Sequence, residues 1–522
     1  MFADKIFNIA SFKEQISKYG FVDFWDMFIR TYTHKQRPDL EKSPSNLDID
    51  LTNPIFDIDN IGELYEIALE YVNKISKKEL GQYYTPADTA NFMATKLINV
   101  NEPNDNIADV CCGTGNLIIS VLKNMPTAQS VRLIKNGQIY LYDLDATAVK
   151  LALMKIAIMF LDKNDIETYS NIEHCIKCST GNFLDDQIYL PNNCNVISNP
   201  PYGKLPKGTS LWLGCETFKT NEMYAIFMEK IAKQSKNAVI ISPQSFLGSS
   251  KFSVLRSILA DRGGTVYAFD NVPASIFMGK KHGIFNTNSA NSVRAAITII
   301  NNTTKGFRIT PLLRFKNTER TELFTNLDKF VGNCINTNSN IWLKTPKCLE
   351  HLVNCLENTS CTVSNITTDT ETDFKLTVPT TPRYFVTASH RKLDRSGSIE
   401  LYAKDKKCFD VLYVLLNSTF SYLWWRICDG GITLTRDTLM HLPVPDITDD
   451  ISDIVDEGIG LESECIHVKT NAGKSNENIK FPEEYRRKLN RIVLNSLEMP
   501  HLEDDLYTIH SNSLKFVLKP WA

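Results

Sequence analysis

Apolar side chains recur at helical spacing over the first 80 residues. Residues 12–33 are aromatic-rich and amphipathic, and residues 61–80 show the same helical spacing of apolar positions. A turn with a proline at a helix start follows, Gly81-Gln82-Tyr83-Tyr84-Thr85-Pro86-Ala87-Asp88, and predicts a helix over residues 87–98. We therefore expect residues 1–80 to form an N-terminal helical segment.

From residue 106 to about residue 300, strand-like runs alternate with helical ones. The predicted strands lie at residues 107–111, 138–142, 172–178, 195–198, 238–242, 265–269 and 294–300. Such alternation is typical of an α/β domain with a mainly parallel sheet, whose ligands bind at the carboxyl ends of the strands. We place this domain at residues 81–302.

The pattern changes after residue 301. Thr303-Thr304-Lys305-Gly306 has the composition of a linker, and residues 358–382 are rich in Thr, Ser and Asn. Short strands and helices then mix without a βαβ rhythm, which predicts a separate α+β domain at residues 303–522. Within it, residues 469–480 are expected to be an exposed loop before a charged helix that begins near Pro482.

Composition describes a globular chain without membrane spans. Of 522 residues, 43% are hydrophobic and 22% charged, and no apolar run approaches the ~20 residues of a membrane helix. The N-terminus does not begin a signal peptide and the thirteen cysteines lack regular spacing, so we expect a cytoplasmic protein with reduced thiols. The lone Cys175-Ile176-Lys177-Cys178 has no second pair at zinc spacing, and we predict no metal site.

Charge is unevenly distributed although the net charge is only −3. Residues 383–407 carry seven Lys and Arg against three Asp and Glu, whereas residues 446–465 carry eight acidic residues and no Lys or Arg. Screening limits each exposed charge to ~10 Å, so a local basic stretch can hold phosphates in a nearly neutral chain. A solvated charged face is the more common reason for such a run.

Asn199-Pro200-Pro201-Tyr202 directly follows a predicted strand. An amino group conjugated to a ring is a weak nucleophile because its lone pair is delocalised. The Asn199 side-chain oxygen and the Pro200 carbonyl could accept both amino protons, and the fixed φ of Pro200 and Pro201 would hold these acceptors in place. Tyr202 offers a ring face for a flat base. The tetrapeptide therefore predicts alkylation of a planar amino group, with a plain turn after a strand as the alternative.

Glycines and acids mark the ends of the first three strands. Asp109-Val110-Cys111-Cys112-Gly113-Thr114-Gly115-Asn116 joins a strand to a helix, and its glycines let the backbone approach a ligand. Tyr142-Asp143-Leu144-Asp145 ends the next strand, where Asp143 can bind ribose hydroxyls, although either acid could instead cap a helix. Gly181-Asn182-Phe183-Leu184 closes the third, where it could hold an adenine. These loops predict a nucleoside cofactor pocket, and the absence of GxGxxG disfavours NAD.

Together these motifs resemble the γ-class adenine-N6 DNA methyltransferases that use S-adenosylmethionine, over residues 81–300 and in the order of that class. The resemblance implies a Rossmann-like class I methyltransferase domain followed by a C-terminal target-recognition domain. It assigns the cofactor to Gln82, Tyr84, Thr85, Pro86, Asp109, Gly113, Thr114, Gly115, Asn116, Asp143, Leu144, Asn182 and Phe183. The class usually carries Asp where this chain has Asn182, a change that bears on affinity because an amide also accepts from an adenine amino group.

Other segments resemble the same class. Residues 275–281 resemble the segment whose aromatic ring stacks on the target base, which pairs Phe277 with Tyr202; core packing is the other interpretation of Phe277. An Asn- and Ser-rich insertion at residues 282–292 splits this segment. Residues 410–445 resemble, more weakly, the tail of a target-recognition domain.

The resemblance implies that the protein flips one adenine out of duplex DNA and methylates its N6, without a metal, in a restriction–modification system or as a stand-alone methylase. The catalytic residues would be Asn199, Pro200, Pro201 and Tyr202, with Tyr202 and Phe277 stacking on the base. The alternatives are an RNA base, a protein glutamine amide or cytosine N4 as the acceptor, and a DNA-recognition subunit without catalysis. Besides double-stranded DNA, a separate restriction or specificity subunit remains open as a partner; a membrane is not expected.

Overall fold

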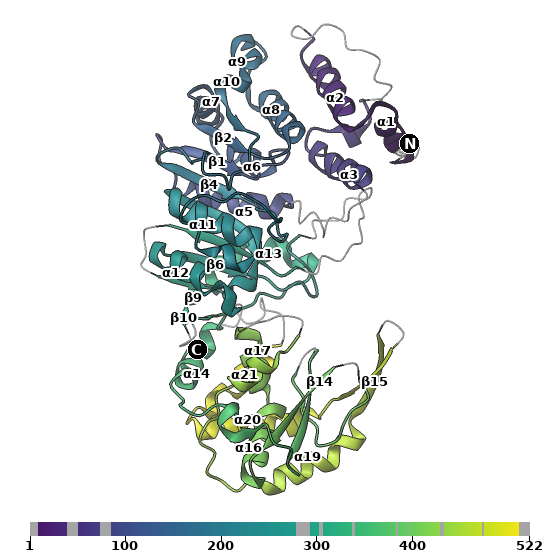
Figure 1. The fold of residues 1–522 in the computed structure, drawn as a ribbon, viewed down its shortest axis with the longest axis vertical. Helices are drawn as coiled ribbons and strands as arrows, with labels where there is room; N and C mark the ends of the chain where they lie inside the picture. The colour runs from purple at the N-terminus through teal and green to yellow at the C-terminus, as the bar shows by residue number, and fades with distance from the viewer. Residues whose placement is uncertain are drawn as a thin grey trace.

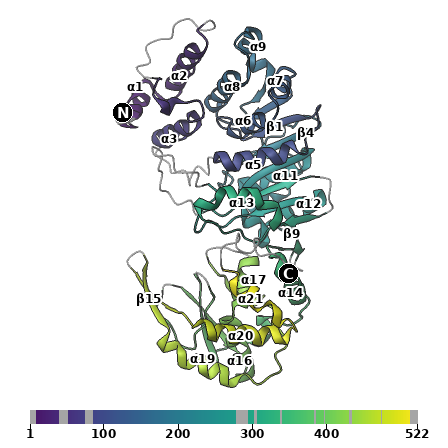
Figure 2. The same ribbon diagram turned by 180° about the vertical axis from the view of Figure 1, so that it is seen from behind.

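The computed structural model describes residues 9–38, 51–73, 85–277, 293–301, 306–336, 340–382, 385–395, 397–428, 433–471 and 474–510. Three parts follow one another along the chain: an N-terminal helical group, a domain built on a large sheet, and a C-terminal part beneath it (Figure 1). Seen from behind, the N-terminal helices remain beside the sheet domain, on the side of α8 (Ala146–Phe160) (Figure 2).

A nine-stranded sheet in the order β3-β2-β1-β4-β5-β7-β6-β8-β9 forms the centre of the upper part. Its strands are β1 (Asn106–Val110), β2 (Ile139–Tyr142), β3 (Lys177–Ser179), β4 (Cys194–Ser198), β5 (Asn237–Pro243), β6 (Gly264–Ala268), β7 (Ala295–Ile300), β8 (Phe307–Ile309) and β9 (Gly332–Asn333). The first five strands of that order run parallel, whereas β7 is antiparallel to β5 and β6. This topology confirms the predicted α/β, Rossmann-like domain.

Helices cover both faces of the sheet because neighbouring strand residues point to opposite sides. On one face, Ile107 and Ile197 pack under α5, α6, α7 and α8. On the other, Ala108 and Val196 pack under α11 and α12. The helices are α5 (Ala87–Ile98), α6 (Asn116–Lys123), α7 (Thr127–Lys135), α9 (Ile166–Ser170), α11 (Met223–Gln234) and α12 (Ser253–Arg262). The predicted helix at 87–98 is thus confirmed at both ends.

The run at residues 172–178 is not one strand, as the apolar pattern had predicted. It divides into α10 (Ile172–Cys175) and β3, which begins only at Lys177. The Cys175 and Ile176 amides donate back to Asn171 and Ile172 in a single helical turn. Because β3 is a short edge strand hydrogen-bonded to β2, local bonds decide the conformation of the residues before it.

The N-terminal segment consists of α1 (Ile9–Tyr19), α2 (Phe21–Gln36) and α3 (Ile61–Asn73). The predicted helical run at 12–33 is interrupted at Gly20, whose φ of 82° lies in the left-handed region. An aromatic core joins the three helices, and Ala148, Leu151 and Met154 of α8 belong to the same core. The segment is therefore packed onto the helix that follows β2.

The sheet continues past residue 302, because β8 pairs with β6 and β9 pairs with β8. Helix α13 (Arg320–Asn326) lies between them in sequence and joins the core on the α5 face. The linker predicted at 303–306 falls largely on residues outside the described part of the chain. The large sheet thus extends as far as Asn333.

The C-terminal part has its own core and mixes small sheets with helices, as predicted. Its elements are β10 (Ile335–Asn336), β11 (Trp342–Leu343), α14 (Glu350–Glu357), α15 (Val363–Ile366), β12 (Thr367–Thr368), β13 (Lys375–Pro379), β14 (Ser398–Ala403), α16 (Lys406–Asn417), α17 (Thr419–Cys428), α18 (Arg436–Met440), α19 (Ser452–Glu464), β15 (Ile466–Asn471), β16 (Lys474–Ile479), α20 (Glu483–Ser496) and α21 (Glu503–Thr508). Helix α20 follows Pro482, where a charged helix was expected.

The exposed loop predicted at 469–480 is wrong, because these residues form most of the β15–β16 hairpin. Its register pairs Ile466 with Ile479, and Ile479 is buried in the C-terminal core. The polar composition of the ribbon hid the strands, which are held by backbone hydrogen bonds rather than by an alternating apolar face.

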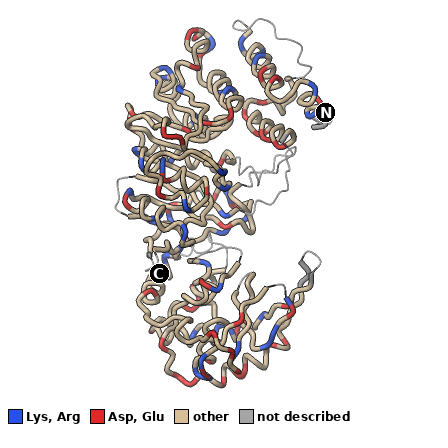
Figure 3. Tube along the Cα trace, viewed as in Figure 1, with Lys and Arg blue, Asp and Glu red and all other residues tan. Residues whose placement is uncertain are grey.

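Charged residues of both signs are spread over all parts of the chain (Figure 3). In the basic stretch, Lys406 pairs with Asp410 at 2.5 Å and Arg395 donates to the Glu477 carbonyl, while Arg391 and Lys392 are exposed. The stretch therefore holds both paired and solvent-facing cations. None of the helices in the described ranges is both long and apolar enough to cross a bilayer.

Candidate active site

The four loops predicted to bind the cofactor or the base all leave the sheet at the same edge, the one formed by the carboxyl ends of its parallel strands. The strand register pairs Val110 with both Tyr142 and Ser198, and pairs Tyr142 with Ser179. Because these strands are parallel, the segments that follow them emerge side by side at their carboxyl ends. The Ser198 hydroxyl donates to the Val110 carbonyl at 2.6 Å and ties the ends of β4 and β1 together, where the Asn-Pro-Pro-Tyr loop and the glycine loop begin.

The glycine loop after β1 takes a shape that depends on Gly115. Its φ is +79°, and a Cβ there would lie 2.8 Å from the Cβ of Ala152 on α8. The carboxylate of Asp109 lies under the loop, fully buried, and accepts from the Ile118 amide at 3.0 Å. Burial raises the pKa of Asp109 well above its usual range, and within the described part of the chain its Oδ1 has no hydrogen-bond partner.

A buried lysine supports the same loop. Lys155 of α8 donates from Nζ to the Thr114 carbonyl at 3.0 Å. The side chain is almost wholly buried, and this burial lowers its pKa to about 8. Sequence reasoning missed Lys155, which looks like an ordinary member of a helical run.

At the end of β2, the two neighbouring acids have different roles. Asp145 is the N-cap of α8 and accepts from the Thr147 and Ala148 amides. Asp143 is half-buried and accepts from the Gly113 amide at 2.7 Å and the Asp145 amide at 2.9 Å. Burial, with the nearby charge of Asp145, raises its pKa.

Between the two acids, Leu144 leaves 71% of its surface in solvent. An apolar side chain beside a partly exposed carboxylate suits a ligand that has both a flat apolar ring and hydroxyl groups. The structure therefore brings together Asp143 and Leu144 as the sequence predicted, and it removes Asp145 from the candidates for ribose binding.

The loop after β3 is more closed than expected. Phe183 is only 3% exposed, and its ring stacks on Phe227 with centroids 5.7 Å apart. Asn182 is half-buried, and its side-chain oxygen accepts from the Leu184 amide at 3.1 Å. Phe183 is thus part of the core on this face, and its contact with a cofactor stays a prediction.

Asn199, at the end of β4, is oriented by a residue from another part of the chain. Its Nδ2 donates to the Thr85 hydroxyl at 3.0 Å. The carbonyl of Thr85 in turn accepts from Nδ2 of Asn116, at the first turn of α6, at 2.6 Å. Thr85 therefore joins the Asn-Pro-Pro-Tyr loop to the glycine loop, and Pro86 follows it as the N-cap of α5.

Tyr202 and Phe277 lie close together. Their ring centroids are 5.9 Å apart with an angle of 61° between the planes, and both side chains are half-buried. A base stacked between two rings needs about 7 Å between parallel faces. The rings therefore form one wall together, and they would have to turn and separate to hold a base between them.

Arg320 of α13 fixes the backbone that leads into Phe277. This arginine is 1% exposed and donates to the Ser275 and Ile276 carbonyls, each at 2.9 Å. It also makes a two-point ion pair with Asp88 of α5, at 2.6 and 2.8 Å. Burial favours the neutral form of Asp88, but the hydrogen bonds and charge of Arg320 outweigh it and lower the pKa of that carboxyl. No motif in the sequence marks Arg320.

The other end of the Phe277 segment is anchored at the C-terminal part. Asp270, after β6, is 3% exposed and faces Arg294, Arg314 and Arg426. Arg426 comes from α17 of the C-terminal part, so an ion cluster joins that part to the segment. Burial opposes ionisation, yet the charges of Arg426 and Arg294 outweigh it and lower the pKa of Asp270.

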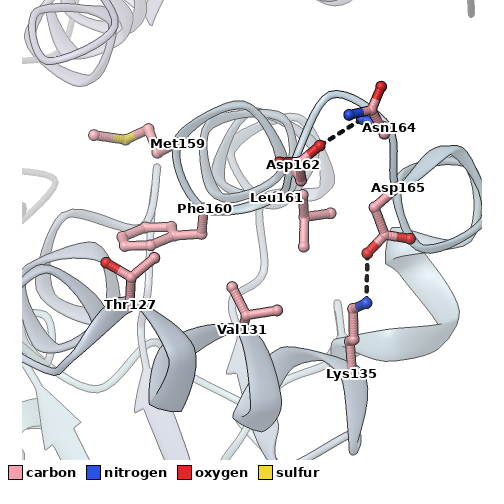
Figure 4. Close-up of a pocket in the computed structure, with 9 residues that line it drawn as sticks. All are labelled: Thr127, Val131, Lys135, Met159, Phe160, Leu161, Asp162, Asn164 and Asp165. Atoms are coloured by element: carbon pink, nitrogen blue, oxygen red, sulfur yellow. Dashed lines mark hydrogen bonds and ion pairs between the residues drawn. The ribbon is translucent and has the colours of Figure 1, made fainter.

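Some predicted site residues cannot be placed. Gln82 and Tyr84 lie outside the described residues, as does the insertion at 282–292. A hollow of about 590 Å³ between α7 and the segment after α8 contains none of the predicted site residues (Figure 4). Lys135 and Asp165 form an ion pair there at 2.7 Å. Since α8 runs from the carboxyl end of β2 back across the sheet, this hollow lies at the opposite edge.

Comparison with known proteins adds to this geometry. A family model described as N-6 DNA Methylase matches residues 56–330. The methylase subunit of type I restriction enzyme MpnII from Mycoplasma pneumoniae is 24% identical over 153 residues, covering 28% of this chain and 26% of that protein. The type II methyltransferase M.VspI from Vibrio sp. (strain 343) is 27% identical over 267 residues, covering 48% of this chain and 60% of that protein.

Among solved structures, the ATP-dependent Type ISP restriction–modification enzyme LlaBIII bound to DNA is similar, with a TM-score of 0.44 and 10% sequence identity. That match covers 95% of this chain and 53% of the other. The chain thus spans less than two thirds of the length of each of these proteins.

Proposed function

This chain belongs to the N-6 DNA methylase family, and on that premise we propose that it transfers a methyl group from S-adenosylmethionine to N6 of an adenine in duplex DNA. The family model covers the glycine loop, the Asn-Pro-Pro-Tyr loop and Phe277 within one match. The order of these elements along the chain resembles that of the γ class, which supports the same proposal.

The observation that carries this proposal is the link through Thr85. With Nδ2 of Asn199 donating to Thr85, the orientation of that amide is fixed, and so is the direction in which its oxygen faces. The Asn116 contact to the same residue sets the amide beside the glycine loop. An acceptor held next to a cofactor loop is the arrangement that methylation of an amino group requires.

The residues at the sheet edge fit S-adenosylmethionine. Asp143 offers a carboxylate to ribose hydroxyls, Leu144 offers an exposed apolar surface, and Asp109 keeps a buried carboxylate oxygen under the glycine loop. When bound, the cofactor supplies an electrophilic methyl group on a sulfonium centre, so the protein needs neither a metal nor a strong base. Thr85 and Pro86 would lie toward its methionine end.

The chain's own residues would act on the adenine. Tyr202 and Phe277 would stack on the flipped base. The Asn199 oxygen and the Pro200 carbonyl would accept the two amino protons, and the N6 lone pair would then be directed at the methyl carbon. The nitrogen would take the methyl carbon as the bond from that carbon to sulfur breaks, and it would then release one proton to water past the Asn199 and Pro200 acceptors. Most of the rate would come from this positioning.

The C-terminal part is the proposed site of DNA recognition. It has a separate core and is joined to the Phe277 segment through Arg426 and Asp270. The basic residues between 383 and 407 would hold phosphates and position the duplex. A second arrangement, in which a separate specificity subunit selects the sequence, is favoured by the similarity to a type I methylase subunit.

The test is to incubate the purified protein with tritiated S-adenosylmethionine and, in parallel, mixed-sequence duplex DNA, total RNA and extract protein. Labelled DNA is then digested to nucleosides. We expect label in N6-methyladenine. Label in N4-methylcytosine would contradict the base assignment, and label only in RNA or protein would contradict the substrate. Cofactor retention without any transfer would contradict a self-sufficient methylase and favour a separate specificity subunit.

A further inference from the structure

The N-terminal segment reaches the cofactor edge of the sheet at one side chain. Tyr65 of α3 is 2% exposed, and its hydroxyl donates to Oδ2 of Asp145 at 2.5 Å. Its ring is fixed by Phe21 and Trp25 of α2, with centroids 5.3 and 5.1 Å away. The hydroxyl is therefore held in place by the aromatic core of the N-terminal segment.

Asp145 connects the fixed Tyr65 hydroxyl to Asp143. Its Oδ1 accepts from the first amides of α8 while Oδ2 accepts from Tyr65, so both oxygens of the carboxylate are fixed. The backbone amide of Asp145 donates to Oδ1 of Asp143. The Gly113 amide holds the other oxygen of Asp143, so the orientation of this carboxylate depends on the turn that Asp145 anchors.

The electrostatics of the turn need the Tyr65 hydroxyl. Two carboxylates two residues apart repel each other, and the charge of Asp145 contributes to the raised pKa of Asp143 after burial. A donor on Oδ2 stabilises the negative charge of Asp145 at its outer oxygen and holds that oxygen toward α3. Burial and this same carboxylate raise the pKa of the Tyr65 phenol, so the hydroxyl remains a donor throughout the physiological range.

We propose that Tyr65 is a positioning residue for the cofactor, through which the N-terminal helical segment sets the Asp143 carboxylate for the ribose hydroxyls. This inference rests on the proposed function in that it takes S-adenosylmethionine as the ligand of the sheet edge. It gives residues 51–73 a role in cofactor binding that the motifs of the sheet domain do not indicate.

Other polar contacts between the segment and the domain provide the comparison. Asp26 of α2 pairs with Lys150 of α8 at 2.9 Å, and Asp59 pairs with Lys123 of α6 at 2.7 Å. Both are ion pairs with solvent-exposed members, and neither involves Asp143 or Asp145. Breaking one of them should loosen the segment without changing the turn.

The test is to titrate wild type, Tyr65→Phe and Asp26→Asn with S-adenosylmethionine by calorimetry and to record the Tm of each. The Phe variant keeps the ring and loses only the hydroxyl, and the loss of a hydrogen bond to a charged group should weaken binding about tenfold. Asp26→Asn should bind as wild type does. An unchanged Kd for Tyr65→Phe, or an equal loss in Asp26→Asn, would overturn the proposal.

A second ligand pair separates positioning from general loosening. Each protein is titrated with S-adenosylhomocysteine and with its 2′-deoxyribose analogue. Wild type should bind S-adenosylhomocysteine more tightly than the 2′-deoxyribose analogue. In Tyr65→Phe the ratio of these two Kd values should be smaller, because the Asp143 carboxylate is no longer oriented toward the ribose hydroxyls. Equal weakening of both ligands would contradict the proposal. If wild type itself bound neither S-adenosylmethionine nor S-adenosylhomocysteine, the proposed function would fail instead.

Discussion

The cofactor side and the base side of this site are built from different kinds of contact. On the cofactor side, Asp143 is held by Gly113, only 30 residues away, through loops that leave adjacent strands. On the base side, the segment before Phe277 is held by Arg320, which pairs with Asp88 at a separation of 232 residues. The first side follows from strand order, whereas the second requires most of the domain to be folded.

This difference indicates which side of the site is sensitive to substitutions elsewhere in the chain. A parallel sheet brings its strand ends to one edge, so the cofactor loops are held mainly by one another, with Tyr65 of α3 as a contact from farther away in the chain. The Phe277 segment is an irregular loop, and ion pairs of buried arginines, Asp88–Arg320 and Asp270–Arg426, take the place of a sheet. We therefore expect variants that support Asp143 to change cofactor affinity, and variants that anchor the Phe277 segment to change methyl transfer.

Among the variants that compare the two sides of the site, the largest effect on cofactor affinity is expected for Asp143→Asn. The substitution keeps the shape of the side chain but removes the negative charge of the carboxylate that would accept hydrogen bonds from the ribose hydroxyls. The loss of such hydrogen bonds should weaken the binding of S-adenosylmethionine about 10- to 100-fold. Calorimetric titration with S-adenosylmethionine measures the loss. Asp165→Asn is the matched control, because Asp165 also accepts from a helix-terminal amide but lies by the hollow at the other edge. Equal losses in both variants would break the comparison.

Arg320→Lys should affect the base side of the site. A lysine can keep one contact to Asp88 but cannot also reach both carbonyls, so the Phe277 backbone loses its fixed position. We expect methyl transfer to DNA to fall about tenfold, given the cost of losing buried hydrogen bonds to a charged group, with cofactor affinity within about twofold of wild type. Single-turnover transfer and calorimetry on one preparation measure the two quantities.

Lys96→Met is the control for Arg320→Lys. Lys96 also joins α5 to the chain near α13, but its ion pair and hydrogen bonds in the described part of the chain go to Asp328, at 2.6 and 2.7 Å, and not to the carbonyls before Phe277. Its loss should leave transfer unchanged. A double variant with Phe277→Ala sharpens the test, because Arg320→Lys should cost little further transfer once the ring is gone. Additive losses would mean that Arg320 acts on general stability alone.

The smallest effect concerns pH and Lys155. Its pKa is about 8 in the folded chain against an ordinary value near 10.5, so between these values the unfolded state binds more protons. The contribution of Lys155 to the free energy of unfolding therefore rises with pH above about 8, at roughly 1 kcal/mol per pH unit. Denaturant unfolding of wild type and Lys155→Met at pH 8 and 9 measures the difference. If the free energy of unfolding of wild type, relative to that of Lys155→Met, decreased from pH 8 to pH 9, the prediction would be contradicted.

The pattern of the sequence was enough to predict where the loops of the proposed cofactor side leave the sheet, while the role of each residue in cofactor binding stays a prediction. Strand ends, the glycine loop and the pair Asp143 and Leu144 lie where alternation and loop chemistry placed them, because each depends on residues close in sequence. The choice between Asp143 and Asp145 needed the structure, since only the cap bonds of α8 distinguish them. Phe183 is more buried than expected, and its contact with the cofactor stays a prediction.

The base side could be predicted only in part. The Tyr202–Phe277 pair was expected, and their rings are in contact, but nothing in the sequence pointed to Arg320 or Asp270. Their roles depend on contacts between residues far apart in the chain. The strand at 172–178 and the loop at 469–480 were wrong for a related reason, since edge pairing and hairpin formation are not visible in apolar periodicity.

The central claim is that Asn199 carries methyl transfer while the cofactor is held elsewhere. Asn199→Ala should be compared with wild type and with Asn192→Ala, an exposed asparagine just before the same strand. On one preparation of each, labelled S-adenosylmethionine binding and transfer to DNA are measured together. We predict that Asn199→Ala binds the cofactor within about twofold of wild type and loses transfer by about 1000-fold, as for other fixed polar groups at a reacting atom. Transfer near the wild-type rate would contradict the account.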